Sequence, residues 1–297
     1  MSRTRSIHMA VAGFVALATI AAGCTTNPPA AGNQYIYKAL AVTAVTTPGD
    51  SPITFWDNDS AEEPYLVHLA LRIKLNAPIA ISLDASSSYS NGGQYICKIN
   101  QGETCPGLPN DGPIFSGLKT PDLMDLATGA PFELVGSVDF LYERDALIPI
   151  GIIGLLQGVA QVANAALPTL LGAGGIPSDA EGIIAFLGKL LPGIVSVIVG
   201  AVGSVLGNLI GADELLGLSP MFFISVGGAL ASIIRGVLPS LLGLVNFALA
   251  QQKPNPFPNG LPISIGVVGD GPTVRYGSAT QVPFRVYDVR YGWDILS

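Results

Sequence analysis

The stretch from residue 146 to residue 252 most constrains the fold of this chain, because it holds very few charged side chains. The rest of the stretch consists largely of Leu, Ile, Val, Ala and Gly in long runs. Charged residues make up only 12% of the whole sequence, about half the usual share of a soluble domain. So apolar a region must be buried in protein, covered by a partner or placed against lipid. Its charged residues are Asp179, Glu181, Lys189, Asp213, Glu214 and Arg235.

Small residues recur through this stretch at helical spacing. In its first segment Gln157, Gln161 and Asn164, with Gly154 and Gly158 alongside, form one polar and small stripe on an apolar helix. Glycine inside a helix costs about 0.5–1 kcal/mol relative to alanine, so we interpret the further stripes as faces for close helix packing. These stripes comprise Gly193, Ser196, Gly200, Gly203, Gly207 and Gly211, and then Gly228, Ser232, Gly236, Ser240 and Gly243.

Length alone would let one of these segments cross a membrane. Residues 190–212 carry no charge and would span about 34 Å as a helix, against roughly 30 Å of hydrocarbon. Arg235, however, interrupts the third apolar run, and no Lys/Arg cluster marks a cytoplasmic loop. We favour a packed or membrane-surface helical domain that folds after export. Helices that insert later, as in a pore or an oligomer, and conventional spans remain open.

The flanking segments, residues 35–145 and 253–297, have short alternating or β-branched runs separated by Gly, Pro and Asx turns. In the C-terminal run the alternation places Tyr287 and Tyr291 on one face and Asp288 and Arg290 on the other. The C-terminal segment has too few strands to bury a core alone. We therefore predict an α+β fold, in which a discontinuous antiparallel β-sandwich carries a large, apolar, Gly-rich helical insertion at residues 146–252.

The N-terminus has the pattern of a secretory signal, with Arg3 and Arg5 before an apolar run. The sequence Ala-Ala-Gly-Cys at residues 21–24 resembles the lipobox of bacterial lipoproteins, with Ala21 where leucine is usual. This resemblance implies removal of residues 1–23 and acylation of Cys24 with fatty acids such as palmitate. The alternative is an ordinary signal that is cut near Gly23 and leaves Cys24 free. Residues 24–34 have the composition of a flexible tether.

The other two cysteines, Cys97 and Cys105, predict a disulfide bond, because an even pair in an exported chain is typically oxidised. Residues 100–102 between them have the chemistry of a hairpin turn. A metal site at this pair would need further ligands, and no histidine is near in sequence.

An acidic loop follows the first predicted strands. Its carboxylates lie close enough together in the sequence to bind a calcium ion. We favour the simpler interpretation of a solvated acidic turn, because the ligand spacing of an EF-hand is absent, and we expect no other cofactor. The residues of this weak calcium candidate are Asp57, Asp59, Glu62 and Glu63.

The sequence contains few candidate catalytic residues. His68 is the one histidine that follows the signal, and it stands in a predicted strand, where a satisfied or surface side chain is the usual outcome. The motifs GxSxG, GxxxxGK[ST] and HExxH are absent. Without its two signal arginines the chain has 14 − 2 = 12 basic and 21 acidic residues, a net charge of −9, which argues against a nucleic-acid partner.

Two functional hypotheses follow. The first is a non-enzymatic lipoprotein of the bacterial cell envelope, bound to the membrane through acylated Cys24, whose helices associate with membrane, with a partner or with copies of the same chain. The second is a carrier of lipid or another apolar ligand, with the helices lining a cavity. An envelope hydrolase is the least supported alternative.

Overall fold

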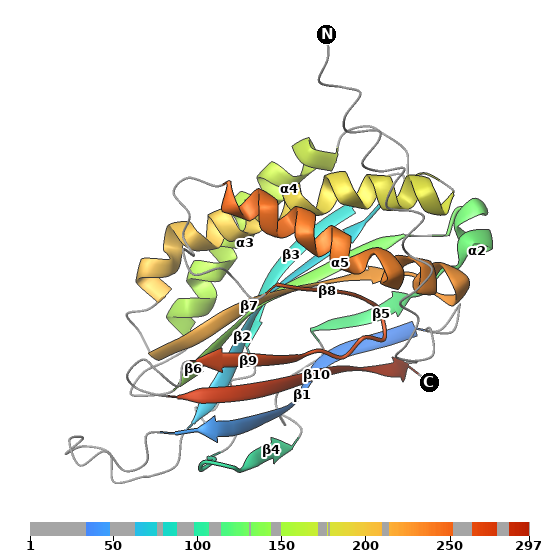
Figure 1. The fold of residues 1–297 in the computed structure, drawn as a ribbon. Coiled ribbons are helices and arrows are strands. Elements are labelled where there is room, and N and C mark those ends of the chain that lie inside the picture. The colour runs from blue at the N-terminus through green and yellow to red at the C-terminus, as the bar shows by residue number, and fades with distance from the viewer. Residues whose placement is uncertain are drawn as a thin grey trace, which may run out of the picture.

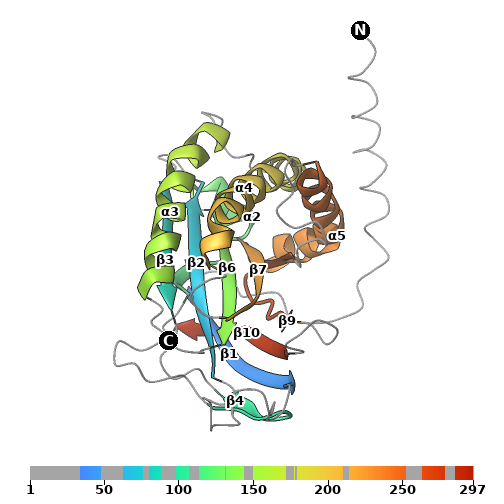
Figure 2. The ribbon, with the colours of Figure 1, turned by 90° about the vertical axis from the view of Figure 1, so that its left-hand side faces the viewer.

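The structure, a computed structural model, has an α+β fold in which a layer of helices and two β-sheets stack on one another (Figures 1 and 2). Each sheet has five strands. The predicted fold class is therefore confirmed. The residues that the structure describes are 34–47, 63–75, 80–87, 98–106, 114–130, 132–143, 150–171, 177, 179–209, 214–251, 263–277 and 285–296.

The first sheet is built from both ends of the described chain. Strand β1 (Gln34–Thr46) pairs antiparallel with the last strand, β10 (Val286–Leu296), which in turn pairs with β9 (Thr273–Gly277). The other edge of β1 is shared by two short strands, β4 (Thr104–Pro106) and β5 (Phe115–Lys119). The two segments that flank the apolar stretch thus combine in one sheet.

The second sheet has the order β3-β2-β6-β7-β8. Its strands pair antiparallel, except that β7 and β8 run parallel. The strands are β2 (Pro64–Lys74), β3 (Ala80–Ser87), β6 (Glu133–Glu143), β7 (Glu214–Ser225) and β8 (Ser264–Val267).

Strand β7 corrects the prediction that residues 146–252 form a helical insertion. It lies within that stretch, yet it pairs with β6 on one side and with β8 on the other. Residues 218–225 are all buried, and a strand that is buried on both faces shows an apolar run without alternation. Such a run looks the same as part of a buried helix, so periodicity could not separate the two.

Three long helices cover one face of the second sheet (Figures 1 and 2). Helix α4 (Ala180–Leu209) lies between α3 (Ile150–Leu171) and α5 (Gly228–Ala250) and contacts both. Helix α3 also contacts β3, and α5 contacts β8. The short helix α2 (Leu123–Ala127) follows β5 and is capped by the carboxylate of Asp122, which accepts hydrogen bonds from two backbone N–H groups of the first turn.

The second sheet shows a different chemistry on each face. Met221 and Phe223 of β7 point toward the first sheet, because both contact Tyr37 of β1. Phe222 and Ile224 therefore point toward the helices, since side chains alternate along a strand. The strand register extends this division across β2 and β6. The helix side is apolar throughout, whereas polar residues gather on the side that faces the first sheet.

Candidate functional site

A row of polar side chains crosses the middle of the second sheet on the side that faces the first sheet. His68 of β2, Asp139 of β6 and Ser219 of β7 lie directly opposite one another in the strand register. The Nδ1 atom of His68 is 3.0 Å from Oδ1 of Asp139, and the two side chains are 1% and 0% exposed. The fold therefore places His68 against a buried carboxylate.

Three buried tyrosines of the first sheet lie near this row. The hydroxyl groups of Tyr276 and Tyr291 are 2.9 Å apart, and the hydroxyl of Tyr37 donates a hydrogen bond of 3.3 Å to Sδ of Met221. Burial raises the pKa of each tyrosine well above its usual value, and the negative charge of Asp139 raises it further. The carboxylate thus acts across the gap between the two sheets.

This cluster lacks the access that catalysis requires. A histidine held by a carboxylate can act as a general base, but a base must reach the proton that it removes. His68, Asp139, Tyr276 and Tyr291 are each no more than 2% exposed. We therefore assign these residues a structural role as a buried polar seam between the sheets.

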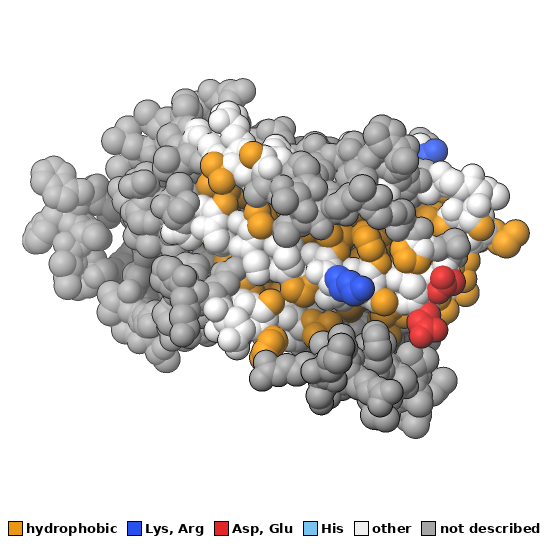
Figure 3. Space-filling view, turned by 90° about the horizontal axis from the view of Figure 1, so that it is seen from above, with side chains coloured by type: hydrophobic (Ala, Val, Ile, Leu, Met, Phe, Trp, Pro, Cys, Tyr) orange, Lys and Arg blue, Asp and Glu red, His pale blue; other side chains and the backbone are white. Residues whose placement is uncertain are grey.

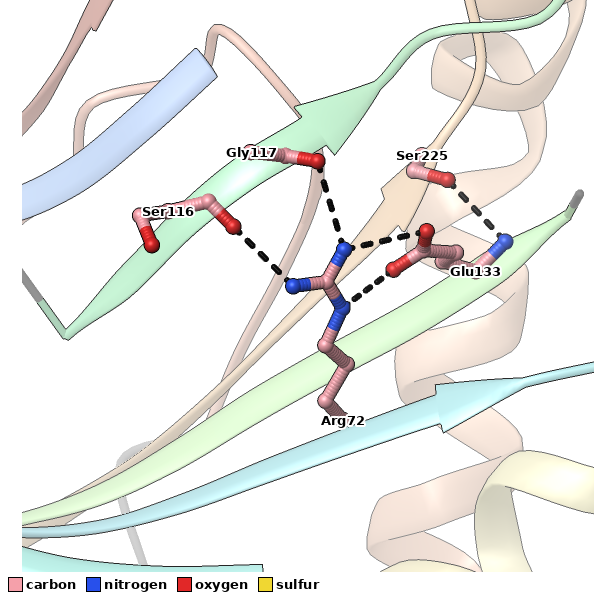
Figure 4. Close-up of polar contacts among 5 residues, drawn as sticks. All are labelled: Arg72, Ser116, Gly117, Glu133 and Ser225. Atoms are coloured by element: carbon pink, nitrogen blue, oxygen red, sulfur yellow. Dashed lines mark hydrogen bonds and ion pairs between the residues drawn. The ribbon is translucent and has the colours of Figure 1, made fainter. Parts of the chain in front are cut away.

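A second polar cluster joins four strands at one end of the sandwich (Figure 4). Arg72 of β2 donates to the carboxylate of Glu133 from Nε at 2.5 Å and from Nη2 at 3.1 Å. The same guanidinium donates to the backbone carbonyls of Ser116 and Gly117 in β5, at 3.0 and 3.3 Å. The backbone N–H of Glu133 donates to Oγ of Ser225 at 3.0 Å. This cluster fixes β5 of the first sheet to β2, β6 and β7 of the second.

The outer side of the helix layer is the most unusual surface of the molecule. Helix α5 buries Leu230, Ile234, Leu241 and related side chains, and none of the residues on its exposed side is charged. Surface helices usually present charged or polar residues to solvent. The exposed side of α5 instead carries Ile233, Leu244 and Phe247, at 41%, 49% and 67% exposure, among the smaller or uncharged Ser232, Gly236, Pro239, Ser240, Gly243 and Asn246.

The other two long helices are less apolar on the outside. The predicted polar stripe of α3 is confirmed, because Gly154, Gln157, Gly158 and Gln161 are exposed and Asn164 is half-buried. Helix α4 exposes Glu181 and Lys189. Seen from the helix side, the described surface shows apolar and uncharged groups with few charges (Figure 3).

The opposite surface, the outer face of the first sheet, is charged. Lys38 forms an ion pair with Asp294, and Arg275 forms one with Asp288 at 2.8 Å. Arg290 on the same face is exposed. In the described part of the chain, the helix side therefore carries few charges and the outer face of the first sheet carries more.

One ion pair holds α5 in place. Arg235 donates from Nε and Nη2 to Oδ1 of Asp270, at 3.1 and 2.8 Å. Asp270 lies in the turn between β8 and β9 and also accepts from the backbone N–H of Val267 at 2.9 Å. This explains how a charged residue fits within the third apolar run, since its partner comes from a distant part of the chain.

Two helical segments, residues 180–203 and 228–250, are long and apolar enough to cross a membrane by length and composition. They are candidate membrane-associating segments. About 44% of the most apolar part of the first is buried inside the protein, against 17% for the second. Helix α4 is therefore covered by the protein more fully than α5, and α5 leaves more of its surface available to an outside contact.

The small residues predicted as helix-packing faces lie mostly on the outside. Gly200, Ser232 and Gly236 are exposed, and a Cβ atom added at Gly200 would meet nothing within 4 Å. The buried side of α4 is formed instead by branched residues such as Ile194 and Val195. At Gly200, Ser232 and Gly236 the stripes therefore do not pack helix against helix within this chain. Of the remaining members, Gly193, Ser196, Gly203 and Gly228 are half-buried, Gly207 lies in α4, and Gly211 is outside the described residues.

Several predicted site residues cannot be compared with the structure. Cys24, Cys97, Asp57, Asp59 and Glu62 lie outside the described residues. Cys105 is buried in β4, and its disulfide bond with Cys97 stays a prediction. Glu63 is described and forms an ion pair of 3.0 Å with Lys98. Within the described ranges, no three His, Cys, Asp or Glu side chains are grouped as metal ligands.

The chain matches no protein-family model, no curated protein and no solved structure. Function must therefore be inferred from the surfaces and the interior of this molecule alone.

Proposed function

We propose that this protein is a non-enzymatic lipoprotein of the bacterial cell envelope, exported and bound to the membrane through acylated Cys24. Its helix layer, and α5 above all, is the surface through which it associates with the membrane or with another molecule. The observation that carries this proposal is the exposed side of α5, which shows Ile233, Leu244 and Phe247 and no charged residue. Exposed apolar patches of this kind mark interaction sites.

The free energy that burial of this α5 surface would contribute fits an auxiliary contact with the membrane or a partner. Complete burial of a large apolar side chain contributes about 1.5–3 kcal/mol, and Ile233, Leu244 and Phe247 are roughly half exposed. Their burial would contribute about 3 kcal/mol together, which is roughly a hundredfold in affinity. Such a contact is too weak to hold a protein alone, but it complements an acyl chain, because stable anchoring requires two signals.

The carrier hypothesis has less support. A cavity that holds lipid would leave its lining residues accessible to a water-sized probe. The inward side chains of the helices, such as Leu167, Leu187 and Ile194, are 0% exposed. In the described part of the chain the helices therefore pack directly on their neighbours, and the interface between them is filled.

Metabolic labelling with an alkynyl fatty acid tests the proposal in a bacterial host that expresses the full chain. We expect label on the wild type, none on Cys24→Ala, and recovery of the labelled protein in the membrane fraction. Leu244→Glu with Phe247→Glu should keep the label but increase the fraction that high salt or mild detergent releases. An unlabelled wild type that is found free in the medium would overturn the proposal.

A further inference from the structure

We infer that the exposed side of α5 lies on the surface of the same bilayer that holds the acyl chains of Cys24. This inference rests on the proposed function and names lipid as the occupant of that surface. It would make the α5 face, defined by Ile233, Leu244 and Phe247, the second contact between this protein and its membrane.

Gln34, which follows the predicted tether, lies on the same side of the fold as the start of α5. Gln34, the first residue of β1, is paired with Lys119, the last residue of β5. Two residues further along, the carbonyl of Pro121 accepts a 2.9 Å hydrogen bond from the N–H of Gly227, the N-cap of α5. The path from Gln34 to the start of α5 consists of one spacing between strands, two residues of chain and one hydrogen bond. Gln34 therefore lies within about 20 Å of the start of α5.

The same two positions are joined by a second, independent set of contacts. Gly117 of β5 lies beside Gln34, since a Cβ atom at Gly117 would be 3.8 Å from Oε1 of Gln34. The carbonyl of Gly117 accepts from Arg72, Arg72 binds Glu133, and the backbone N–H of Glu133 donates to Oγ of Ser225 (Figure 4). Ser225 ends β7, two residues before Gly227. The position of Gln34 relative to the start of α5 is therefore fixed by the fold.

The tether is long enough to let α5 reach the membrane and short enough to keep it there. Cys24 is 34 − 24 = 10 residues from Gln34, a distance of at most about 35 Å when extended and roughly 17 Å on average. A flexible linker of this length gives an effective concentration in the millimolar range. A weak apolar contact on α5 would therefore be occupied most of the time once Cys24 is anchored.

The distribution of charge indicates which side of the molecule lies on the bilayer and how deeply α5 can enter it. The outer face of the first sheet carries Lys38, Arg275 and Arg290 with their acidic neighbours, and these groups favour water. The exposed side of α5 is uncharged. Deep insertion of α5 would have to separate or bury the ion pair between Arg235 and Asp270. The helix is therefore placed flat on the bilayer, with Phe247 entering the interfacial region.

Fluorescence quenching by lipids tests this arrangement in the acylated full chain. Phe247→Cys would be labelled with an environment-sensitive fluorophore and reconstituted with vesicles of phosphatidylethanolamine and phosphatidylglycerol that contain a nitroxide lipid. Arg290→Cys is the matched control, because Arg290 is exposed on the outer face of the first sheet and pairs with Ala41, away from Gln34. We expect at least twofold stronger quenching at position 247 than at position 290.

Leu244→Cys provides a second probe on the same side of α5, in case labelling at position 247 disturbs the fold. A Gly/Ser insertion of about twenty residues into the tether should lower the effective concentration roughly fivefold and reduce the quenching at both α5 positions.

Two results would overturn the inference while leaving the proposed function intact. In the first, the protein floats with the vesicles but both α5 labels are quenched no more than the label at position 290. In the second, the α5 labels are shielded from nitroxide lipid and also from aqueous iodide, which would mean that another copy of the chain covers them. Failure of all variants to float with vesicles would contradict the proposed function itself.

Discussion

The Nδ1 atom of His68 lies 3.0 Å from Oδ1 of Asp139, and both side chains are closed off between the two sheets. The two residues are 71 positions apart in sequence and directly opposite in the register of β2 and β6. Ser219 extends the row to β7. This seam specifies which residues of the second sheet face the first, because a one-residue shift of β2 would turn His68 toward the apolar helices.

Substitution of one partner of this pair should be costly. His68→Leu leaves the carboxylate of Asp139 buried without its partner, and we expect a loss of about 3–5 kcal/mol in the free energy of unfolding. The double variant with Asp139→Leu should recover part of that loss, because no unpaired charge then remains. Urea denaturation followed by circular dichroism measures both. A double variant less stable than His68→Leu would contradict this account.

The buried tyrosines predict sensitivity to alkali. The pKa values of Tyr37, Tyr276 and Tyr291 are raised in the folded protein by burial and then by the charge of Asp139. Since each folded pKa exceeds the unfolded value of about 10, their contribution to stability is complete below that pH and is lost as pH rises through the folded values.

Ultraviolet absorbance of phenolate should therefore show two classes of tyrosine, with the buried class ionising only as the protein unfolds. Tyr276→Phe with Tyr291→Phe should shift alkaline unfolding to higher pH. Reversible titration of all tyrosines in one step near their usual pKa, without unfolding, would rule out this burial.

Removal of Arg72 should loosen the junction between the sheets. Arg72→Met leaves Glu133, whose side chain is 4% exposed, without its main cation, and we expect a loss of about 2–3 kcal/mol in the free energy of unfolding. Arg275→Met is the matched control, because Arg275 also pairs with a carboxylate but is 65% exposed. The control should cause no measurable change, and equal losses in the two variants would refute the assignment.

Two glycines should respond to alanine in opposite directions. Gly243 lies inside α5, and a Cβ atom there would meet nothing within 4 Å, so Gly243→Ala should stabilise the fold by about 0.5–1 kcal/mol. Gly277 has a φ of +86°, and its Cβ atom would lie 1.9 Å from the carbonyl oxygen of Arg285. Gly277→Ala should therefore destabilise the protein by about 3 kcal/mol or more. Thermal unfolding compares the two with the wild type.

The features that follow from local periodicity were predictable from the sequence. The outward polar stripe of α3 agrees with its helical spacing, with Gln157 and Gln161 exposed. In β10, Tyr287 and Tyr291 are buried whereas Asp288 and Arg290 point outward, as the alternation predicts. Each of these features depends on neighbours within a few residues, so one segment contains all the information that is needed.

Features that depend on distant partners were not predictable in this way. β7 has an apolar run because both of its faces are covered, and its sequence cannot reveal that β6 and β8 flank it. The role of Asp139 has a weaker signal, since it is a single charge within the apolar run of β6, which suggests a buried partner without naming His68. The exposed side of α5 could not be distinguished from its buried side until the position of Arg235 beside Asp270 was known.

The pairing of β1 with β10 has a consequence for how the chain folds. During synthesis β1 is among the first strands to be made, and its central partner is the last, with Gln34 paired to Leu296. Contacts of such long sequence separation form slowly, because a large loop must close before they are made. Until residues 286–296 emerge, β1 has an open edge on that side, and partly made chains are exposed to aggregation there. The first sheet can therefore be completed only once residues 286–296 are available to pair with β1.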